Sequence, residues 1–165
     1  MIIGVTGDYA SGKDSVADIL IEKGFFHVSF SNLIREELNK DKKQITRDNL
    51  IKRGNELREK YGSKILARLS LEKVKEGENF VFTSIRNSGE VELLQSREDF
   101  ILINVTAPEK VRLQRIISRN RESDPKTIED LRRKENIERS NDPNAQQLHK
   151  VAKMAKIVLV NDTTI

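Results

Sequence analysis

The sequence predicts an α/β fold of three layers, in which helices cover both faces of a five-stranded parallel sheet. Five short apolar runs, rich in β-branched and aromatic residues, alternate with stretches of helical periodicity, and this alternation is typical of parallel sheets. A length of 165 residues suits one domain, which we expect to span 1–165. The predicted strands cover residues 2–5, 25–30, 80–82, 100–105 and 157–160.

Helices in the first half of the chain are predicted from apolar spacing and from residues that begin or end helices. Gly24 ends the first helix, and Ser31 or Asn32 can cap the second. Gly62 and Gly77 end the two helices that follow. The predicted helices of this half cover residues 12–23, 31–38, 46–61 and 63–76.

In the second half, Pro108 fits the first turn of a helix whose inner face we expect to carry Ile116 and Ile117. The polar stretch 120–126 contains a proline and predicts a loop. The predicted helices of this half cover residues 90–95, 108–119, 128–140 and 148–154.

The composition bounds the class of protein. The chain has no cysteine, which excludes disulfides and thiolate chemistry, and its net charge of +4 suits phosphorylated small molecules. With no 18-residue apolar run and no cleavable leader, we expect a cytoplasmic protein that does not enter membranes. A nucleic-acid partner is not expected, because basic residues are interleaved with acidic ones and only 5% of residues are aromatic. Nothing in the sequence indicates an oligomeric state.

The segment after the first predicted strand carries the clearest functional signal. Residues 7–13 fit the phosphate-binding pattern G-x-x-x-x-G-K and run into a predicted helix. Gly7 and Gly12 permit torsions that turn successive amides inward around phosphate oxygens, and the helix start adds unpaired N–H donors. Lys13 supplies a positive charge for the β- and γ-phosphates. The predicted ATP-binding residues are Gly7, Asp8, Tyr9, Ala10, Ser11, Gly12, Lys13, Asp14 and Ser15.

One position departs from this pattern. The residue after the motif lysine is normally Ser or Thr, whose hydroxyl binds Mg²⁺, whereas here Asp14 follows the lysine and Ser15 comes next. A carboxylate beside a triphosphate is repelled unless a cation lies between them, and carboxylate oxygen is a good ligand for Mg²⁺. We therefore expect Asp14 and Ser15 to hold the Mg²⁺ that accompanies ATP. In this variant the loop resembles that of some deoxynucleoside monophosphate kinases.

Ordered pieces along the whole chain resemble the P-loop nucleoside monophosphate kinases and dephospho-coenzyme A kinase, and most closely the small archaeal kinase-like proteins of this group. Besides the loop, the pieces are Ser31–Arg35, Thr83–Arg86 and Arg115–Arg119. The resemblance implies a P-loop kinase fold with an acceptor-binding helical insert at about 31–75 and an arginine lid at about 119–140. The chain departs from the family at Asn32, where an acidic residue is usual.

The resemblance also implies roles for individual arginines. Arg35 and Arg86 would hold the acceptor phosphate from two sides. Guanidinium groups of the lid would neutralise charge on the transferring phosphoryl group. The implied catalytic residues are Lys13, Arg115, Arg119 and Arg121. Three further arginines are expected to be solvated helix residues paired with nearby glutamates, namely Arg132, Arg133 and Arg139.

Together these residues predict an ATP-dependent phosphotransferase that moves the γ-phosphoryl group to a small phosphorylated acceptor, a nucleoside or deoxynucleoside monophosphate. Thr83 and Ser84 stand where a Walker B aspartate would end the third strand, and the second strand also lacks a terminal aspartate. A phosphate acceptor needs little base catalysis, whereas a sugar hydroxyl needs more. Dephospho-coenzyme A kinase is therefore the second interpretation, and a catalytically degenerate nucleotide-binding protein is the third.

Overall fold

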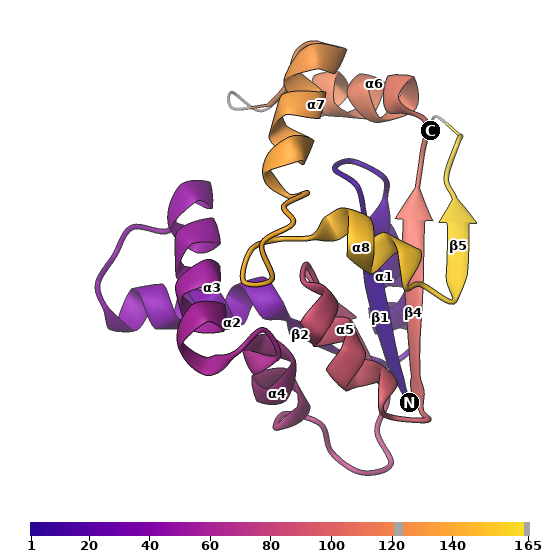
Figure 1. The fold of residues 1–165 in the computed structure, drawn as a ribbon. Helices are drawn as coiled ribbons and strands as arrows, with labels where there is room; N and C mark the ends of the chain where they lie inside the picture. The colour runs from indigo at the N-terminus through magenta and orange to yellow at the C-terminus, as the bar shows by residue number, and fades with distance from the viewer. Residues whose placement is uncertain (121–123, 164–165) are drawn as a thin grey trace.

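A single parallel sheet organises the chain (Figure 1). The computed structural model describes residues 1–120 and 124–163, and its strands lie in the order β2-β3-β1-β4-β5. Every pair is parallel, with Ile2 opposite both Phe80 and Phe100. The strands are β1 (Ile2–Gly7), β2 (Phe26–Ser29), β3 (Phe80–Thr83), β4 (Phe100–Thr106) and β5 (Ile157–Val160). The predicted α/β class and five-stranded parallel sheet are confirmed.

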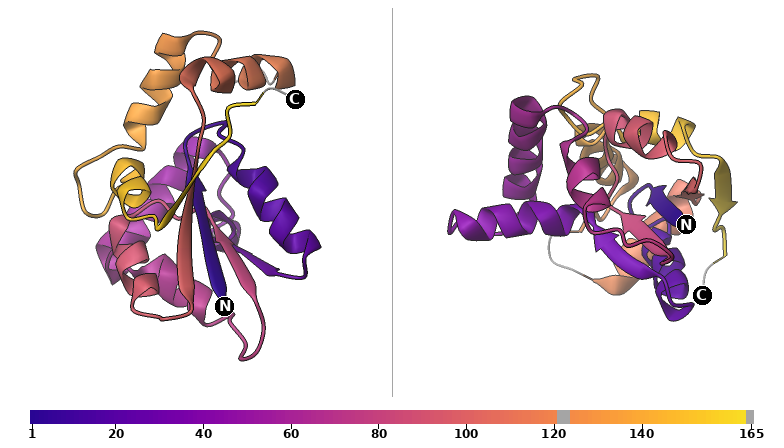
Figure 2. Two further views of the ribbon diagram at one scale, coloured as in Figure 1. Left: turned by 90° about the vertical axis from the view of Figure 1, so that its right-hand side faces the viewer. Right: turned by 90° about the horizontal axis from the view of Figure 1, so that it is seen from below.

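Helices of the described part of the chain cover both faces of the sheet and its carboxyl end. They are α1 (Lys13–Glu22), α2 (Phe30–Lys40), α3 (Arg47–Tyr61), α4 (Ile65–Leu71), α5 (Ser88–Gln95), α6 (Glu109–Arg119), α7 (Ile128–Ile137) and α8 (Leu148–Lys153). Helix α1 lies on one face, and α5 and α8 lie on the other (Figure 2). Helices α6 and α7 lie beyond the carboxyl ends of the strands, and α2 to α4 stand to one side (Figure 1). None of the described helices is both long and apolar enough to cross a membrane.

Alternating strand side chains divide the core into the two layers that this arrangement needs. Ile2, Phe80 and Phe82 belong to the apolar cluster that includes residues of α5 and α8. Val5 and Val81 belong to a second cluster, which packs on α1. Because successive strand residues point to opposite faces, one short apolar run supplies both layers. The three-layer prediction is thereby confirmed.

Several element boundaries differ from the prediction. Helix α2 begins at Phe30, which the sequence predicts as strand; its ring is buried against Phe82, and Ser29 takes the N-cap position expected of Ser31 or Asn32. Helix α7 ends at Ile137 and not at residue 140, because the chain leaves the helix to form an antiparallel bridge with the segment before α8. Ile117, predicted to face inward, is 54% exposed on α6.

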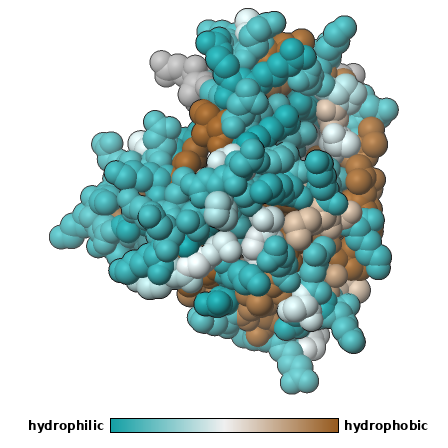
Figure 3. Space-filling view, in the orientation of Figure 1, coloured by the Kyte–Doolittle hydropathy of each residue, from teal (hydrophilic) through white to brown (hydrophobic). Residues whose placement is uncertain are grey.

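The β5 edge differs from the rest of the sheet. This strand pairs with β4 on one side, and each of its four aliphatic residues is at least 40% exposed. They form part of the brown strip at the right of the space-filling view (Figure 3). Apolar character therefore predicts this strand correctly, although its side chains are not buried within the described chain.

A buried ion pair fixes the helical segment α2–α4 to the turn after β3. Arg58 of α3 donates from Nε and Nη2 to Glu90 Oε1 at 3.0 and 2.8 Å, and neither side chain is more than 1% exposed. The other oxygen, Glu90 Oε2, accepts from the amides of Arg86 and Asn87 at 2.9 and 3.0 Å. The pair therefore shapes the turn that carries Arg86.

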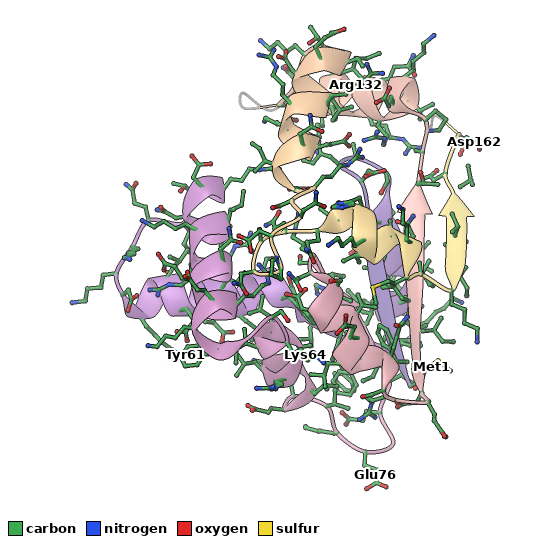
Figure 4. All side chains as sticks on the ribbon, viewed as in Figure 1. Met1, Tyr61, Lys64, Glu76, Arg132 and Asp162 are labelled. Carbon is green, nitrogen blue, oxygen red and sulfur yellow. The ribbon has the colours of Figure 1, made fainter. Side chains whose placement is uncertain are left out.

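Replacing Arg58 with methionine would leave the Glu90 carboxylate buried without its guanidinium. We expect Arg58→Met to lower the free energy of unfolding by about 3–5 kcal/mol. Urea denaturation measures this loss. Arg132→Met is the control, because Arg132 lies on the outer surface, paired with Glu109 (Figure 4), and should leave stability nearly unchanged. Equal losses in the two variants would contradict the assignment.

Candidate functional site

The glycine-rich loop between β1 and α1 has the backbone that its sequence predicts. Gly7 has φ 156° and Gly12 has φ 94°. A Cβ on Gly7 would lie 2.2 Å from the Val105 carbonyl oxygen, and one on Gly12 would lie 2.2 Å from Asn161 Nδ2. Ala10 also has a positive φ of 59°, which is unfavourable for a residue with a Cβ. The loop is therefore a strained turn that the surrounding contacts hold in place.

Two arginines of α6 donate hydrogen bonds to backbone carbonyls of this loop. Arg112 Nη1 donates to the carbonyl of Tyr9 at 3.2 Å. Arg115 Nη1 donates to the carbonyls of Ala10 and Ser11 at 3.2 and 3.3 Å. Three successive carbonyl oxygens are thus held by guanidinium groups from a helix about a hundred residues further along the chain.

The segment after β5 completes this support. Asn161 Nδ2 donates to the carbonyl of Ser11 at 3.1 Å, and Asn161 Oδ1 accepts from Arg115 Nη2 at 3.0 Å. In a trans peptide the N–H points opposite to the carbonyl. The amides of Ala10 and Gly12 therefore point away from the donors that hold these carbonyls, and both residues line a cavity, as a phosphate cradle requires.

A cavity of about 520 Å³ lies in front of the loop and collects most of the predicted site. The predicted residues that line it are Gly7, Tyr9, Ala10, Gly12, Lys13, Asp14, Ser15, Arg35, Arg86, Arg115 and Arg119. Two further predicted residues of the loop do not line the cavity: Ser11 is buried, and Asp8 pairs with Arg139. Arg121 lies outside the described residues. Residues predicted to bind ATP and residues predicted to bind the acceptor therefore line the same cavity.

Lys13 extends from the start of α1 into this cavity. Its side chain is 24% exposed, and its Nζ lies 3.9 Å from Asp14 Oδ1. Burial lowers the pKa of Lys13 below its ordinary value; Asp14 raises that pKa in part, and the positive charge of Arg86 lowers it further. A partly desolvated ammonium at this position is strongly attracted to anionic ligands.

The residues predicted to hold Mg²⁺ are accessible from the cavity. Asp14 is 87% exposed and Ser15 is also exposed. No group of three or more His, Cys, Asp or Glu side chains within 1–120 and 124–163 could hold a metal ion. One exposed carboxylate fits Mg²⁺, which commonly takes one or two protein carboxylates and completes its shell with phosphate oxygens and water.

The part of the cavity predicted to bind the acceptor is lined by three arginines rather than the predicted two. Arg35 Nη1 donates to Ser31 Oγ and Asn32 Oδ1, both at 2.9 Å. Arg86, after β3, and Arg47, at the start of α3, both line the cavity as well. All three arginines also line an adjoining cavity of about 130 Å³ that extends beneath α3.

A glutamate that the sequence does not single out lies between two of these arginines. Glu138, just past α7, accepts from Arg47 Nη2 at 2.6 Å through Oε1, and Arg86 Nη1 lies 2.9 Å from the same oxygen. Its side chain is only 10% exposed. A phosphate entering this position would therefore compete with Glu138 for both guanidinium groups.

The predicted lid arginine is also paired. Arg119 donates from Nε and Nη2 to Asp124 at 2.6 and 2.9 Å, and the hydroxyl of Tyr9 donates to the same carboxylate at 2.7 Å. The guanidinium groups of Arg119 and Arg47 lie 4.7 and 5.6 Å from the centre of the Tyr9 ring. Tyr9 of the loop thus contacts both the start of α3 and the end of α6.

Of the three arginines predicted to be solvated helix residues, one has a different position. Arg132 and Arg133 are exposed as predicted. Arg139 is also exposed and its Nη2 lies 3.7 Å from Glu135, as predicted, but it follows the end of α7 and lies 3.3 Å from Asp8 in the loop as well. The sequence could not indicate this contact, because the early end of α7 redirects the chain.

Serine hydroxyl groups stand at the carboxyl ends of β2 and β3. Ser29, at the end of β2, lies 2.9 Å from Ser31 and 3.5 Å from Ser84, measured between hydroxyl oxygens. Ser84 follows β3 with φ 62°, a strained value that places its side chain at the cavity wall. At Ser29 and Ser84, next to the ends of β2 and β3, the chain therefore offers hydroxyl groups, which form hydrogen bonds but are much weaker bases than carboxylates.

A family model described as an AAA domain, AAA_18, matches residues 3–140. The chain is also 32% identical over 164 residues to a UPF0200 protein of Sulfurisphaera tokodaii, a match that covers 99% of this chain and 89% of the relative. The chain belongs to the AAA_18 and UPF0200 families. A UPF0200 protein of Thermococcus kodakarensis is 33% identical to it over 138 residues, covering 79% and 75% of the two chains.

Solved structures resemble this AAA_18 domain in fold. TT1252 from Thermus thermophilus has a TM-score of 0.60 and 22% identity, covering 99% of this chain and 90% of its own. Shikimate kinase from Bacteroides thetaiotaomicron has a TM-score of 0.56 and 17% identity, covering 96% and 85%. The domain therefore has the P-loop kinase fold, as its residues predict, while these low identities carry no information about its substrate.

The hydrogen bonds of Asp124 predict its titration. Arg119 and, to a smaller extent, the Tyr9 hydroxyl lower the pKa of Asp124 to about 2. A lowered carboxyl pKa means that the pair stabilises the fold above the ordinary value near 4 and loses this effect as the pH falls through about 2. A ¹³C NMR titration should give this low midpoint, and Tyr9→Phe should raise it in part. A midpoint near 4 in the unchanged AAA_18 domain would contradict the contact.

Proposed function

We propose that this UPF0200 protein is an ATP-dependent phosphotransferase. It moves the γ-phosphoryl group to a small phosphorylated acceptor, a nucleoside or deoxynucleoside monophosphate. One observation carries the proposal: a single cavity is lined both by the glycine-rich loop with Lys13 and by Arg35 and Arg86. Donor and acceptor phosphates bound at these two walls would meet in one space, which is the main requirement of phosphoryl transfer.

The cavity residues divide into two binding groups. Lys13 and the inward amides of the loop bind the β- and γ-phosphates of ATP. Arg35 and Arg86 hold the acceptor phosphate, and we add Arg47 as a third ligand, because it shares Glu138 with Arg86. The helices α2 to α4 act as the acceptor-binding insert.

The segment 119–140 acts as the lid. Arg119 leaves Asp124 and stabilises the charge on the transferring phosphoryl group, with Arg121 as a further predicted contributor. Arg115 is engaged by the loop carbonyls, so we assign it a positioning role and not direct contact with the reacting atoms. Closing the lid also excludes water and suppresses hydrolysis.

Asp14, with Ser15 beside it, would hold Mg²⁺ next to the nucleotide. When bound, Mg²⁺ supplies positive charge at the β- and γ-phosphate oxygens. The protein side of this contact is a single exposed carboxylate at the start of α1, where the helix also presents free N–H groups. Removal of Mg²⁺ by a chelator should therefore abolish transfer.

A phosphate acceptor suits the strand ends better than a sugar hydroxyl. Ser29 and Ser84 cannot act as a carboxylate base, and Glu138 is already engaged by two guanidinium groups. A sugar hydroxyl, as in dephospho-coenzyme A, gains more from a base than an existing phosphate does. Nucleoside monophosphates are therefore the preferred acceptors, and dephospho-coenzyme A is the alternative that an acceptor panel separates.

The first test of this function is Lys13→Ala. Turnover, measured by coupled ADP release with a panel of acceptors, should fall by about 10²–10³-fold, as when one preorganised donor is removed. Near-normal turnover in the variant would rule out the role of Lys13. Tight ATP binding by the unchanged protein, with no Mg²⁺-dependent transfer to any acceptor, would instead favour a nucleotide-binding protein without catalysis.

The role of Arg47 has a separate test. Removing one charge-assisted contact to the acceptor phosphate should raise the acceptor KM about tenfold or more in Arg47→Ala, with the KM for ATP unchanged. Lys52→Ala on the same helix is the matched control, because Lys52 is exposed and lines neither of the two adjoining cavities. Equal acceptor KM values in the two variants would remove Arg47 from the site.

A further inference from the structure

The outer edge of β5 lacks the features that usually protect the edge of a sheet. Among the described strands, β5 pairs only with β4, and Figure 1 and Figure 2 show no described helix or strand beside its other edge. Its four residues, Ile157–Val160, are aliphatic and 40–65% exposed. Proteins usually protect such an edge with a charge, a proline, a bulge or a covering element, because its free N–H and C=O groups can pair with another strand. The edge of β5 therefore suits a partner strand.

Hydrogen bonds to β4 show which backbone groups of this edge are free. Val160 lies opposite Thr106 of β4, and the next amide, that of Asn161, donates to the Thr106 carbonyl at 2.7 Å. Backbone groups of successive strand residues point to opposite edges, so those of Leu159 also face β4. The N–H and C=O groups of Val158 and Val160 therefore point outward.

An antiparallel second copy of β5 fits these groups in one register. When Val158 of each copy lies opposite Val160 of the other, the two residues exchange both of their backbone hydrogen bonds. Leu159 then lies opposite its own copy on the two-fold axis. A shift by one residue would place outward groups opposite inward ones, and a shift by two would place a valine opposite Lys156 or Asp162.

The same register matches the charges that flank the strand. Lys156 lies in the bend before β5, where its amide donates to Leu102 of β4 at 3.0 Å, and Asp162 follows the strand; both side chains are exposed. In the antiparallel pair, Lys156 of each copy lies opposite Asp162 of the other. Opposite charges across two strands attract each other, whereas like charges repel. The edge is thus complementary to itself in hydrogen bonds, apolar side chains and charge.

We propose that β5 is the contact surface of a two-fold dimer, in which the antiparallel β5 strands of two copies join their sheets into one. Each copy uses its β5 edge once, so the assembly closes at two copies. The contact is short, and small interfaces are weak. The dimer therefore forms at high protein concentration and dissociates on dilution.

Analytical ultracentrifugation of the whole chain over a range of concentrations tests this dimer. The unchanged protein should shift from monomer to dimer as its concentration rises. Lys156→Glu places like charges opposite each other at both ends of the contact and should raise the dimer Kd about tenfold. Asp162→Lys should do the same, whereas the two changes combined restore opposite charges and should return the Kd close to its original value.

Lys52→Glu is the matched control. It makes the same charge change at an exposed position on α3, a helix that stands on the side of the molecule away from β5 (Figure 1), and it should leave the Kd nearly unchanged.

Cysteine substitutions test the register, because the chain has no cysteine of its own. Leu159 and its copy form a pair without mutual hydrogen bonds, in which the Cα atoms are about 4.5 Å apart, so Leu159→Cys should form an intermolecular disulfide on mild oxidation. Val158→Cys is the control, because the two copies of residue 158 lie diagonally at about 7–8 Å, too far apart for a disulfide. A non-reducing gel measures the linked dimer.

A protein that stays monomeric at every concentration overturns the inference. A dimer that Lys156→Glu weakens no more than Lys52→Glu does also overturns it, as does a disulfide that forms as readily in Val158→Cys as in Leu159→Cys. A dimer that both single charge changes weaken, that the combined variant restores and that Leu159→Cys links supports it.

Discussion

The structure depends on hydrogen bonds to three successive backbone carbonyl oxygens of the glycine-rich loop, those of Tyr9, Ala10 and Ser11. These carbonyls accept hydrogen bonds from the side chains of Arg112, Arg115 and Asn161. Because the peptide bond is planar and trans, the amide N–H of each such peptide then points away from these donors. Glycine at both ends makes this backbone possible, but it does not select it from the many conformations that glycine allows. Contacts from α6 and from the segment after β5 make that selection.

The same cavity gathers many positive charges, and the fold balances them with carboxylates. The ion pairs that do so join Glu138 to Arg86 and Arg47, and Asp124 to Arg119. Each pair lowers the repulsion that the arginines would otherwise exert on one another. A phosphate group can exchange with such a carboxylate without leaving a guanidinium unpaired, which makes the pairs suitable for a site that binds and releases anions.

Much of the fold and the glycine-rich loop at the cavity follow from the sequence, because they rest on local patterns. The strand runs, the loop glycines and Lys13 occupy fixed spacings that physics links directly to backbone shape. Arg47 and Glu138 could not be found in this way, because spacing along the chain shows neither how α3 packs beside the cavity nor where α7 ends. Asn161 could have been identified from the sequence as a candidate, because it directly follows the carboxyl end of a predicted strand, where the ligand sites of parallel sheets lie.

The most direct measurement of the central claim is an ¹⁵N–¹H NMR titration of the protein with ADP. If the loop is a phosphate cradle, the largest saturable amide shifts will fall on residues 8–13, and Arg115→Met, which removes a donor from two of the three carbonyls and leaves only Asn161 on Ser11, will weaken the binding. Shifts concentrated elsewhere, or binding that Arg115→Met leaves unchanged, would contradict the account.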